Sequence, residues 1–166
     1  MTFGKRLFDL GLAILLLVIL GPTIAILAIV LKVKEGGPIF YLSERMKTVE
    51  NSFYLINDSG VSGGDKADRI TPLGSFMRKT RLDELPQLWN VLRGDISFVG
   101  PRPPLRVYVD QFPELYGVVL KSRPGITGLA SVRFHAHEER LLARCQTAAQ
   151  TNMVYVRDCI PRKVKL

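Results

Sequence analysis

The chain has 166 residues, of which 47% are hydrophobic and 23% are charged, and its formal net charge is +8. This composition excludes a disordered chain, and the length predicts a single domain with a modest core. The positive charge favours polyanionic partners, a class that includes nucleic acid, anionic lipid head groups and phosphorylated substrates.

The first predicted element is an uncharged, apolar segment of 22 residues, 10–31. As one straight helix it would be roughly 33 Å long, which is enough to cross a bilayer. The apolar run is longer than the core of a usual signal peptide, and no small-residue cleavage site follows it, so we expect it to be retained. The sequence therefore predicts a membrane helix over residues 1–34.

Two features bear on how this helix enters the membrane. Lys5-Arg6 precedes the apolar run and Lys32 and Lys34 follow it, so both flanks carry the basic residues typical of a cytoplasmic side. Gly21-Pro22 lies at the midpoint, where the proline removes a backbone donor and can bend the helix. These features favour a re-entrant helix over an ordinary kinked span, which stays open as the alternative.

The remainder, residues 35–166, is typical of a soluble domain held against the membrane. We expect a strand over residues 39–42 and a Gly- and Asp-rich loop over residues 57–68. Thr71-Pro72 is typical of a helix start, with Thr as the cap and Pro at the first helical position. One face of that helix is apolar and the other cationic, which suits either the domain core or the lipid interface.

A second helix is predicted over residues 83–93, where leucines and a tryptophan recur at helical spacing. Pro86 fits only in its first turn, and Gly94 closes it. Asp83 and Glu84 would then lie at the helix N-terminus, where the helix dipole favours their ionised forms.

Two segments rich in proline and glycine follow, residues 99–104 and 123–128. We predict that both are loops and that each displays an arginine, Arg102 and Arg123. A helix is predicted between them over residues 105–112.

The C-terminal part is polar and predicted to be helical over residues 135–158, before a basic tail over residues 161–166. The tail is interpreted as a solvated or lipid-facing end. His135 and His137 point to different faces of a helix because they are two residues apart, so we expect ordinary surface residues and not metal ligands.

Adjacent carboxylates with arginines nearby form the candidate reactive site. Ionised carboxylates such as Asp83 and Glu84 can bind Mg²⁺ or attack phosphorus, and arginines can neutralise a diphosphate bidentately. The arginines concerned are Arg78, Arg81, Arg102 and Arg123. The alternative is that Asp83 caps its helix and Glu84 only favours the dipole, and spacing alone leaves both interpretations open.

Residues 69–104 read RITPLGSFMRKTRLDELPQLWNVLRGDISFVGPRPP. This segment resembles the signature of the bacterial sugar transferases, the small monotopic phosphoglycosyl transferases. Further matches are Lys5-Arg6 with Asp9, GPIFYLSERM at residues 37–46, RPGITG at residues 123–128 and PRKVKL at the end. Together these motifs cover nearly the whole chain in the order that the family has them.

The resemblance implies an α/β, mostly helical fold in two parts. Residues 1–34 would form the re-entrant membrane helix, broken near Gly21-Pro22. Residues 35–166 would form a small catalytic domain whose amphipathic helices rest on the cytoplasmic face of the inner membrane.

The resemblance also implies an enzyme that begins polysaccharide or glycoconjugate assembly. Such a transferase moves a sugar 1-phosphate from a UDP-sugar to polyprenol phosphate, undecaprenyl phosphate in bacteria, and releases UMP. The implied cofactor is Mg²⁺, and the implied partners are the UDP-sugar, the polyprenol phosphate and membrane lipid, with no nucleic acid.

Residue roles follow from the matching motifs. Asp83 would be the nucleophile that carries the phosphosugar as an acyl phosphate, Glu84 would hold the metal with Asp83 or tune it, and Arg78 would orient this dyad. The implied substrate-binding residues are Arg81, Arg102, Pro103, Arg123 and Gly125.

Two departures from the family pattern bear on activity. FYLINDSG at residues 53–60 stands where a lysine, Phe, arginine motif is usual, and Leu129-Ala130-Ser131 stands where Trp-Ala-Gln is usual. They motivate a first alternative, a relative that binds a sugar nucleotide or lipid phosphate without turnover. A second alternative, a membrane-tethered nucleic-acid-binding protein, rests on charge alone because no fold motif for nucleic acid is present.

Overall fold

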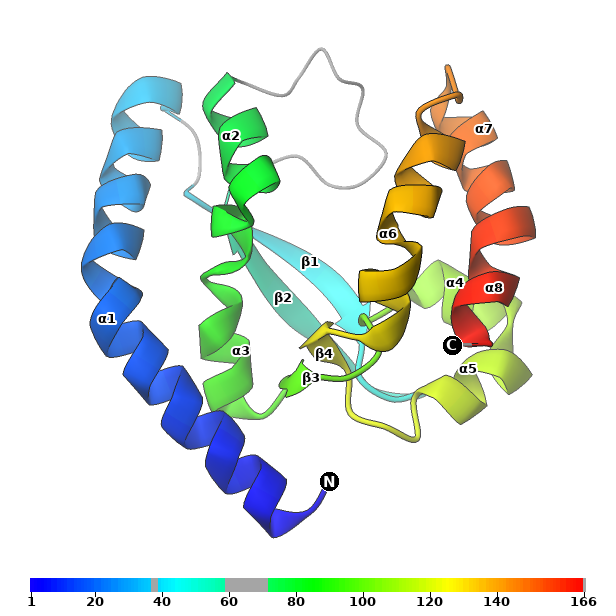
Figure 1. Ribbon diagram of the computed structural model, residues 1–166, viewed down its shortest axis with the longest axis horizontal. Helices are drawn as coiled ribbons and strands as arrows, with labels where there is room; N and C mark the ends of the chain where they lie inside the picture. The colour runs from blue at the N-terminus through cyan, green and yellow to red at the C-terminus, as the bar shows by residue number, and fades with distance from the viewer. Residues whose placement is uncertain (37–38, 59–71, 166) are drawn as a thin grey trace.

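The computed structural model describes residues 1–36, 39–58 and 72–165. A long N-terminal helix lies along a mostly helical domain that also contains two small, two-stranded sheets (Figure 1), which agrees with the predicted class. The elements in chain order are α1 (Phe3–Glu35), β1 (Phe40–Met46), β2 (Ser52–Asp58), α2 (Pro72–Thr80), a 3-10 turn (Leu82–Glu84), α3 (Gln87–Arg93), β3 (Ser97–Val99), α4 (Arg106–Gln111), α5 (Pro113–Val119), β4 (Gly125–Thr127), α6 (Leu129–Leu142), α7 (Ala148–Val154), a π-helical turn (Tyr155–Cys159) and α8 (Ile160–Val164).

The N-terminal helix α1 is continuous, where we expected a break at Gly21-Pro22. Pro22 lies inside the helix, and the ribbon changes direction part-way along it (Figure 1). Proline removes one hydrogen bond and crowds the preceding turn, which bends a helix that strong helix formers continue on both sides. The helix is long and apolar enough to cross a membrane, and only 6% of its most apolar stretch is buried within the protein.

Polar contacts fasten the first turns of α1 to the domain. The Arg6 guanidinium donates to two carbonyl oxygens in the last turn of α3, at 2.6 and 2.7 Å, and so satisfies groups that a helix end leaves open. Asp9 is buried, and its Oδ2 accepts from Ser97 Oγ at 2.8 Å while Lys5 Nζ lies 3.7 Å from the same oxygen. The N-terminal end of α1 is therefore part of the domain that its C-terminal end leads into.

Strands β1 and β2 pair antiparallel, with Phe40 opposite Asp58 and Met46 opposite Ser52. The strand expected over residues 39–42 therefore continues to Met46. We expected a loop over residues 57–68, but Asn57 and Asp58 belong to the ladder, and residues 59–68 lie outside the described residues.

A buried asparagine ties this hairpin to α3. The Asn90 side chain accepts from the Ile56 N–H at 3.1 Å and donates to the Tyr54 carbonyl oxygen at 2.8 Å. A core of buried apolar side chains from α1, β2, α3 and the residue that precedes β3 forms beside it. Its members are Ala13, Phe53, Leu55, Val91 and Ile96.

The two segments rich in proline and glycine lie against each other, and the second is not wholly a loop. Residues of β4 pair parallel with β3, Ser97 with Gly125 and Val99 with Thr127. A Cβ atom at Gly100 would lie 2.2 Å from a carbonyl oxygen, and one at Gly125 would lie 2.3 Å from a backbone nitrogen, so neither position has room for a side chain. This close contact fixes the loop that carries Arg102.

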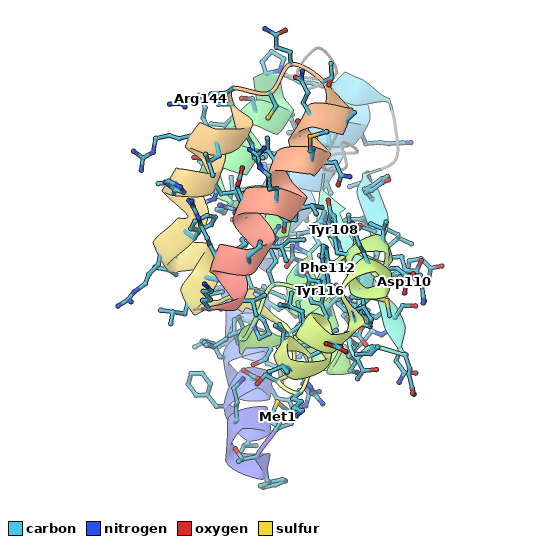
Figure 2. All side chains as sticks on the ribbon, turned by 90° about the vertical axis from the view of Figure 1, so that its right-hand side faces the viewer. Met1, Tyr108, Asp110, Phe112, Tyr116 and Arg144 are labelled. Atoms are coloured by element: carbon cyan, nitrogen blue, oxygen red, sulfur yellow. The ribbon has the colours of Figure 1, made fainter. Side chains whose placement is uncertain are left out.

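Of the tail that we expected to be solvated or lipid-facing, Pro161, Arg162 and Lys165 are exposed, whereas Lys163 and Val164 are partly buried. Ile160 is buried, and Lys163 Nζ lies 2.7 Å from a carboxylate oxygen of Glu138 on α6. The predicted polar helix is divided into α6, α7 and a π-helical turn, which brings Tyr155 beside Tyr108 with ring centroids 5.1 Å apart. Figure 2 shows Tyr108 and Tyr116 where α4 and α5 approach the C-terminal helices.

Candidate active site

Asp83 and Glu84 lie in the 3-10 turn Leu82–Glu84 and not at the start of a helix, so that prediction is wrong. Helix α3 begins four residues after Asp83, at Gln87, with Pro86 as its N-cap. The reason is local: Pro86 has no N–H to donate, and hydrogen bonds three residues apart, such as Leu85 N–H to the Leu82 carbonyl, wind this stretch tightly. Asp83 is therefore not the N-cap of α3, and the capping alternative does not account for an acidic residue at this position.

Arg81 opens this turn in the left-handed backbone conformation, with φ +59° and ψ +21°. Such a conformation is uncommon for a residue with a Cβ, and it persists where surrounding contacts hold it. Here the side chain supplies one of them, because its guanidinium donates to Glu84 Oε1 at 3.0 Å.

Glu84 is the carboxylate on which two arginines converge. Arg102, from the loop after β3, donates to the same Oε1 atom at 3.2 Å. The Glu84 side chain is only 13% exposed, and both ion pairs use one of its two oxygens. The structure thus brings together three of the residues singled out in the sequence, from segments eighteen residues apart.

His135 extends this cluster, although we expected it to be an ordinary surface residue. Its Nε2 lies 2.8 Å from the second terminal nitrogen of Arg81 and 3.4 Å from Glu139 Oε1. Since an arginine nitrogen only donates, Nε2 is the acceptor in the contact with Arg81. His137 faces elsewhere, toward Arg162 at 2.8 Å, which confirms that the two histidines point to different sides of α6.

A cavity of about 950 Å³ opens beside the cluster. One part is polar, and the other is formed by apolar side chains that include two from α1. The polar lining residues include Arg81, Glu84, Arg102, His135, Glu138, Glu139 and Lys163, and the apolar ones include Leu16, Leu20, Leu85, Leu88 and Phe98. A charged group and a hydrophobic chain can therefore be accommodated side by side.

Asp83 lies in the same turn, between the lining residues Arg81 and Glu84. Its side chain is partly exposed, and its Oδ1 is shielded from solvent. Asp83 itself is not among the residues that line the cavity, although Arg81 and Glu84 are.

The other predicted site residues lie at different distances from this cluster. Arg78 is on α2, with its side chain outside the described part of the structure. Pro103 is buried and lines a second cavity, of about 470 Å³. Gly125 donates its N–H to the Pro101 carbonyl oxygen at 2.9 Å, which supports the Arg102 loop.

Arg123 lies away from both cavities, among the residues that the structure describes. Its guanidinium is next to Gly94, close to that of Arg6 at the end of α3. The two arginines together place positive charge at a helix C-terminus, where the dipole favours it.

Asp83 and Glu84 could bind a magnesium ion only together with further oxygen ligands, such as those of water or a substrate phosphate. The described residues contain no group of three or more acidic, histidine or cysteine side chains that would hold a metal by themselves. Mg²⁺ commonly uses one or two carboxylates with water and substrate phosphates, and Asp83 and Glu84 are two adjacent carboxylates. The residues present therefore suit a metal that arrives with a phosphorylated substrate.

Residues 1–161 match the family described as bacterial sugar transferase. A glucose-1-phosphate transferase of Escherichia coli (strain K12), named for UDP-glucose and undecaprenyl phosphate, is 32% identical over 93% of this chain and 36% of its own length. An enzyme of the same name from Caulobacter vibrioides is 36% identical over 78% of this chain and 53% of its own.

A third relative is named for a different sugar. The N-acetylgalactosaminephosphotransferase of Aeromonas hydrophila, also named for undecaprenyl phosphate, is 34% identical over 79% of this chain and 34% of its own length. The chain thus spans about a third of the length of the proteins from Escherichia coli and Aeromonas hydrophila.

Proposed function

The chain belongs to the bacterial sugar transferase family, and on this premise we propose that it transfers a sugar 1-phosphate from a UDP-sugar to undecaprenyl phosphate, with release of UMP. The names of three relatives support this reaction, since each is a transferase or phosphotransferase for undecaprenyl phosphate. They are named for glucose or N-acetylgalactosamine, so the proposal does not specify the sugar.

The observation that carries the proposal is the cluster beside Asp83. Arg81 and Arg102 lie 3.0 and 3.2 Å from Glu84, at the polar part of a cavity whose apolar part reaches α1. Guanidinium groups bind phosphate oxygens bidentately, and apolar side chains suit an isoprenoid. The cavity thus suits the two unlike parts of a polyprenol phosphate.

The proposed reaction has two displacement steps at phosphorus. In the first, a carboxylate oxygen of Asp83 forms a bond to the β-phosphorus of the UDP-sugar, and the bond from that phosphorus to the bridging oxygen breaks with UMP as the leaving group. In the second, a phosphate oxygen of undecaprenyl phosphate bonds to the same phosphorus and the Asp83 carboxylate leaves. The enzyme returns to its starting state after each cycle.

The surrounding side chains have supporting roles in this mechanism. Arg81 and Arg102 neutralise the charge of the diphosphate. Asp83 and Glu84 would hold Mg²⁺, which when bound neutralises phosphate oxygens and makes UMP a better leaving group. Glu84 also keeps Arg81 and Arg102 in place while substrate is absent.

We propose that α1 enters the cytoplasmic leaflet of the inner membrane and returns to the cytoplasmic side, with residues 35–166 as the catalytic domain on that face. The support is that both ends of α1 belong to the same domain. Arg6 and Asp9 pack against α3 and β3, and Glu35 is followed within a few residues by β1. A helix that crossed the bilayer would separate these ends by its thickness.

A turnover assay tests the function. The purified chain in lipid nanodiscs, supplied with UDP-sugars, undecaprenyl phosphate and Mg²⁺, is expected to release UMP steadily with at least one sugar. Asp83→Asn is the control, because any contaminating transferase would be unaffected by it. Binding of UDP-sugar without UMP release from any donor would support the alternative of a binding protein and overturn the proposal.

A further inference from the structure

Arg81 and His135 connect two elements that are far apart in sequence. Arg81 precedes the 3-10 turn that contains Asp83 and Glu84, and His135 lies on α6. Both side chains line the cavity of about 950 Å³, and His135 Nε2 lies 2.8 Å from Arg81 Nη2. The contact therefore lies in the polar part of the cavity, beside the two carboxylates of the turn.

The two terminal nitrogens of Arg81 have different partners. Nη1 donates to Glu84 Oε1 at 3.0 Å, and Nη2 is the atom that contacts His135. An arginine side chain loses considerable rotamer freedom when it is fixed, and the Arg81 backbone is already in the left-handed conformation. Two acceptors on different nitrogens define the place of a guanidinium better than one. His135 is thus one of two side chains that hold Arg81 at the cavity.

The proton on the imidazole determines whether His135 can do so. Because a guanidinium nitrogen only donates, Nε2 must carry a lone pair, and the proton of the neutral ring is then on Nδ1. The same Nε2 atom lies 3.4 Å from Glu139 Oε1. A protonated ring has an N–H at Nε2, which can donate to this carboxylate and is repelled by the Arg81 charge. One atom therefore has two alternative partners, and a proton selects between them.

Charged side chains from several elements line the cavity around His135, and most of them are paired with each other. These pairs are Glu84 with Arg81 and Arg102, and Glu138 with Lys163. Tyr155 is a further titratable neighbour, and burial raises the pKa of its hydroxyl, so it stays uncharged. Among the described residues, Glu139 is the lining carboxylate whose ion pair is with His135 alone. It is therefore available to the imidazole in its protonated form.

We propose that His135 is a positioning residue that holds the Arg81 guanidinium only while its imidazole is neutral. This inference rests on the proposed function, in which Arg81 neutralises the diphosphate of the donor. A proton taken from solvent at Nε2 turns this nitrogen from an acceptor for Arg81 into a donor to Glu139, and the guanidinium loses one of its two holding contacts. Histidine changes its charge between about pH 5 and 8, so the reaction should lose efficiency on the acid side of neutrality.

The first test is kcat/KM for UMP release by the parent chain, His135→Gln and His137→Gln in nanodiscs, from about pH 8 to about pH 5. A glutamine amide oxygen accepts from Arg81 at every pH, and the substrates titrate equally in all three proteins. We expect the ratio of the parent value to that of His135→Gln to fall about tenfold as the pH is lowered. His137→Gln is the matched control, since His137 contacts Arg162 instead, and it should follow the parent. A constant or rising ratio would overturn the proposal.

Glu139→Gln tests the alternative partner. Loss of the carboxylate charge makes the protonated imidazole less favourable, so the fall in kcat/KM should occur at a pH lower by roughly 0.2–0.7 unit, as expected for an exposed ion pair. Glu114→Gln, at an exposed position on α5, is the control and should leave the curve in place. An unchanged curve in Glu139→Gln, or a shift to higher pH, would contradict the exchange of partners.

The tautomer of His135 is measurable without turnover. The chain has two histidines, so nitrogen-15 labelling of the imidazoles gives two sets of NMR signals, each assigned from its glutamine variant. Near pH 8 we expect the His135 proton on Nδ1, and Arg81→Met should remove this preference without changing the His137 signals. A proton on Nε2 in the parent would refute the proposal. This tautomer without UMP release from any donor would refute only the proposed reaction, whereas turnover with a constant ratio would refute only the role of His135.

Discussion

Asp9 and Glu84 both lie next to cationic side chains, but they differ in how many of their oxygens have partners among the described residues. Asp9 is 1% exposed, and both of its oxygens are used, one by Ser97 and Lys5 and the other by the Phe98 N–H. Glu84 is 13% exposed and lines a large cavity, and the two arginines that pair with it among the described residues, Arg81 and Arg102, contact the same oxygen. A carboxylate with partners on both oxygens stabilises the fold. A carboxylate that uses one oxygen in the contacts described, and that lies beside a cavity, can still bind a ligand.

The contrast assigns different roles to the two regions. The cluster at Asp9 fixes α1 to α3 and β3, so it decides where the apolar helix lies. The turn that contains Asp83 and Glu84 is held by a left-handed residue, Arg81, and by contacts that substrate phosphates can replace. Substitutions in the first region should lower stability, and those in the second should lower activity.

The largest expected effect is at Asp83. Asp83→Asn should lower turnover at least about a thousandfold, because an amide is not a useful nucleophile toward phosphorus. The thermal unfolding temperature should stay close to that of the parent, since Asp83 does not cap α3. UMP release near the parent rate from this variant would remove Asp83 from the mechanism.

Glu84→Gln should have the next largest effect. The variant keeps an oxygen for Arg81 and Arg102 but loses the charge, and we expect turnover to fall on the order of a hundredfold. The concentration of Mg²⁺ that gives half-maximal turnover should rise, and chelation with EDTA should abolish turnover by the parent. An unchanged magnesium requirement in Glu84→Gln would argue against Glu84 as a ligand.

A structural feature of these regions can be predicted from the sequence when a local pattern determines it, and cannot when tertiary contacts determine it. The apolar helix and the helix beginning at Pro72 were predictable because periodicity and proline position act locally. The turn at Asp83 was assigned to a helix, since a sequence does not show whether hydrogen bonds link residues three or four apart.

The histidine and the second cavity depend on contacts that no local pattern reveals. His135 meets Arg81 across 54 positions of sequence. Arg45 and Arg102 line one cavity from segments far apart in sequence, which meet where the Met46 N–H donates to the Pro104 carbonyl oxygen. A motif match marked the segment that contains Arg45 but gave it no role.

Asp9→Ala tests the first region. It removes the carboxylate that pairs with Lys5 and accepts from Ser97, and we expect a loss of about 2–3 kcal/mol in the free energy of unfolding, measured by denaturation in detergent. Asp110→Ala, on the exposed side of α4 (Figure 2), is the control and should cost little. If the Asp9→Ala variant folded but lost turnover as completely as Asp83→Asn, the assignment of a structural role to Asp9 and a catalytic role to Asp83 would be wrong.

The smallest expected effect is at the histidine that positions Arg81. His135→Leu should lower kcat/KM about tenfold, because Arg81 loses an acceptor that helps to hold its guanidinium near Glu84. His135→Gln should restore most of the activity by offering an amide oxygen at a similar place, and His137→Leu is the matched control on the same helix. Equal losses at His135 and His137 would show that the helix, and not the contact with Arg81, is responsible.

The central claim, that Asp83 carries the phosphosugar, is tested most directly by trapping the intermediate. The chain is incubated with UDP-sugar and Mg²⁺ but without undecaprenyl phosphate, quenched, and analysed by intact and peptide mass spectrometry. We expect one phosphosugar per chain, located on the peptide that contains Asp83, absent from Asp83→Asn and discharged when undecaprenyl phosphate is added. An unmodified chain that nevertheless turns over when both substrates are present, or a phosphosugar attached to another residue, would contradict the account.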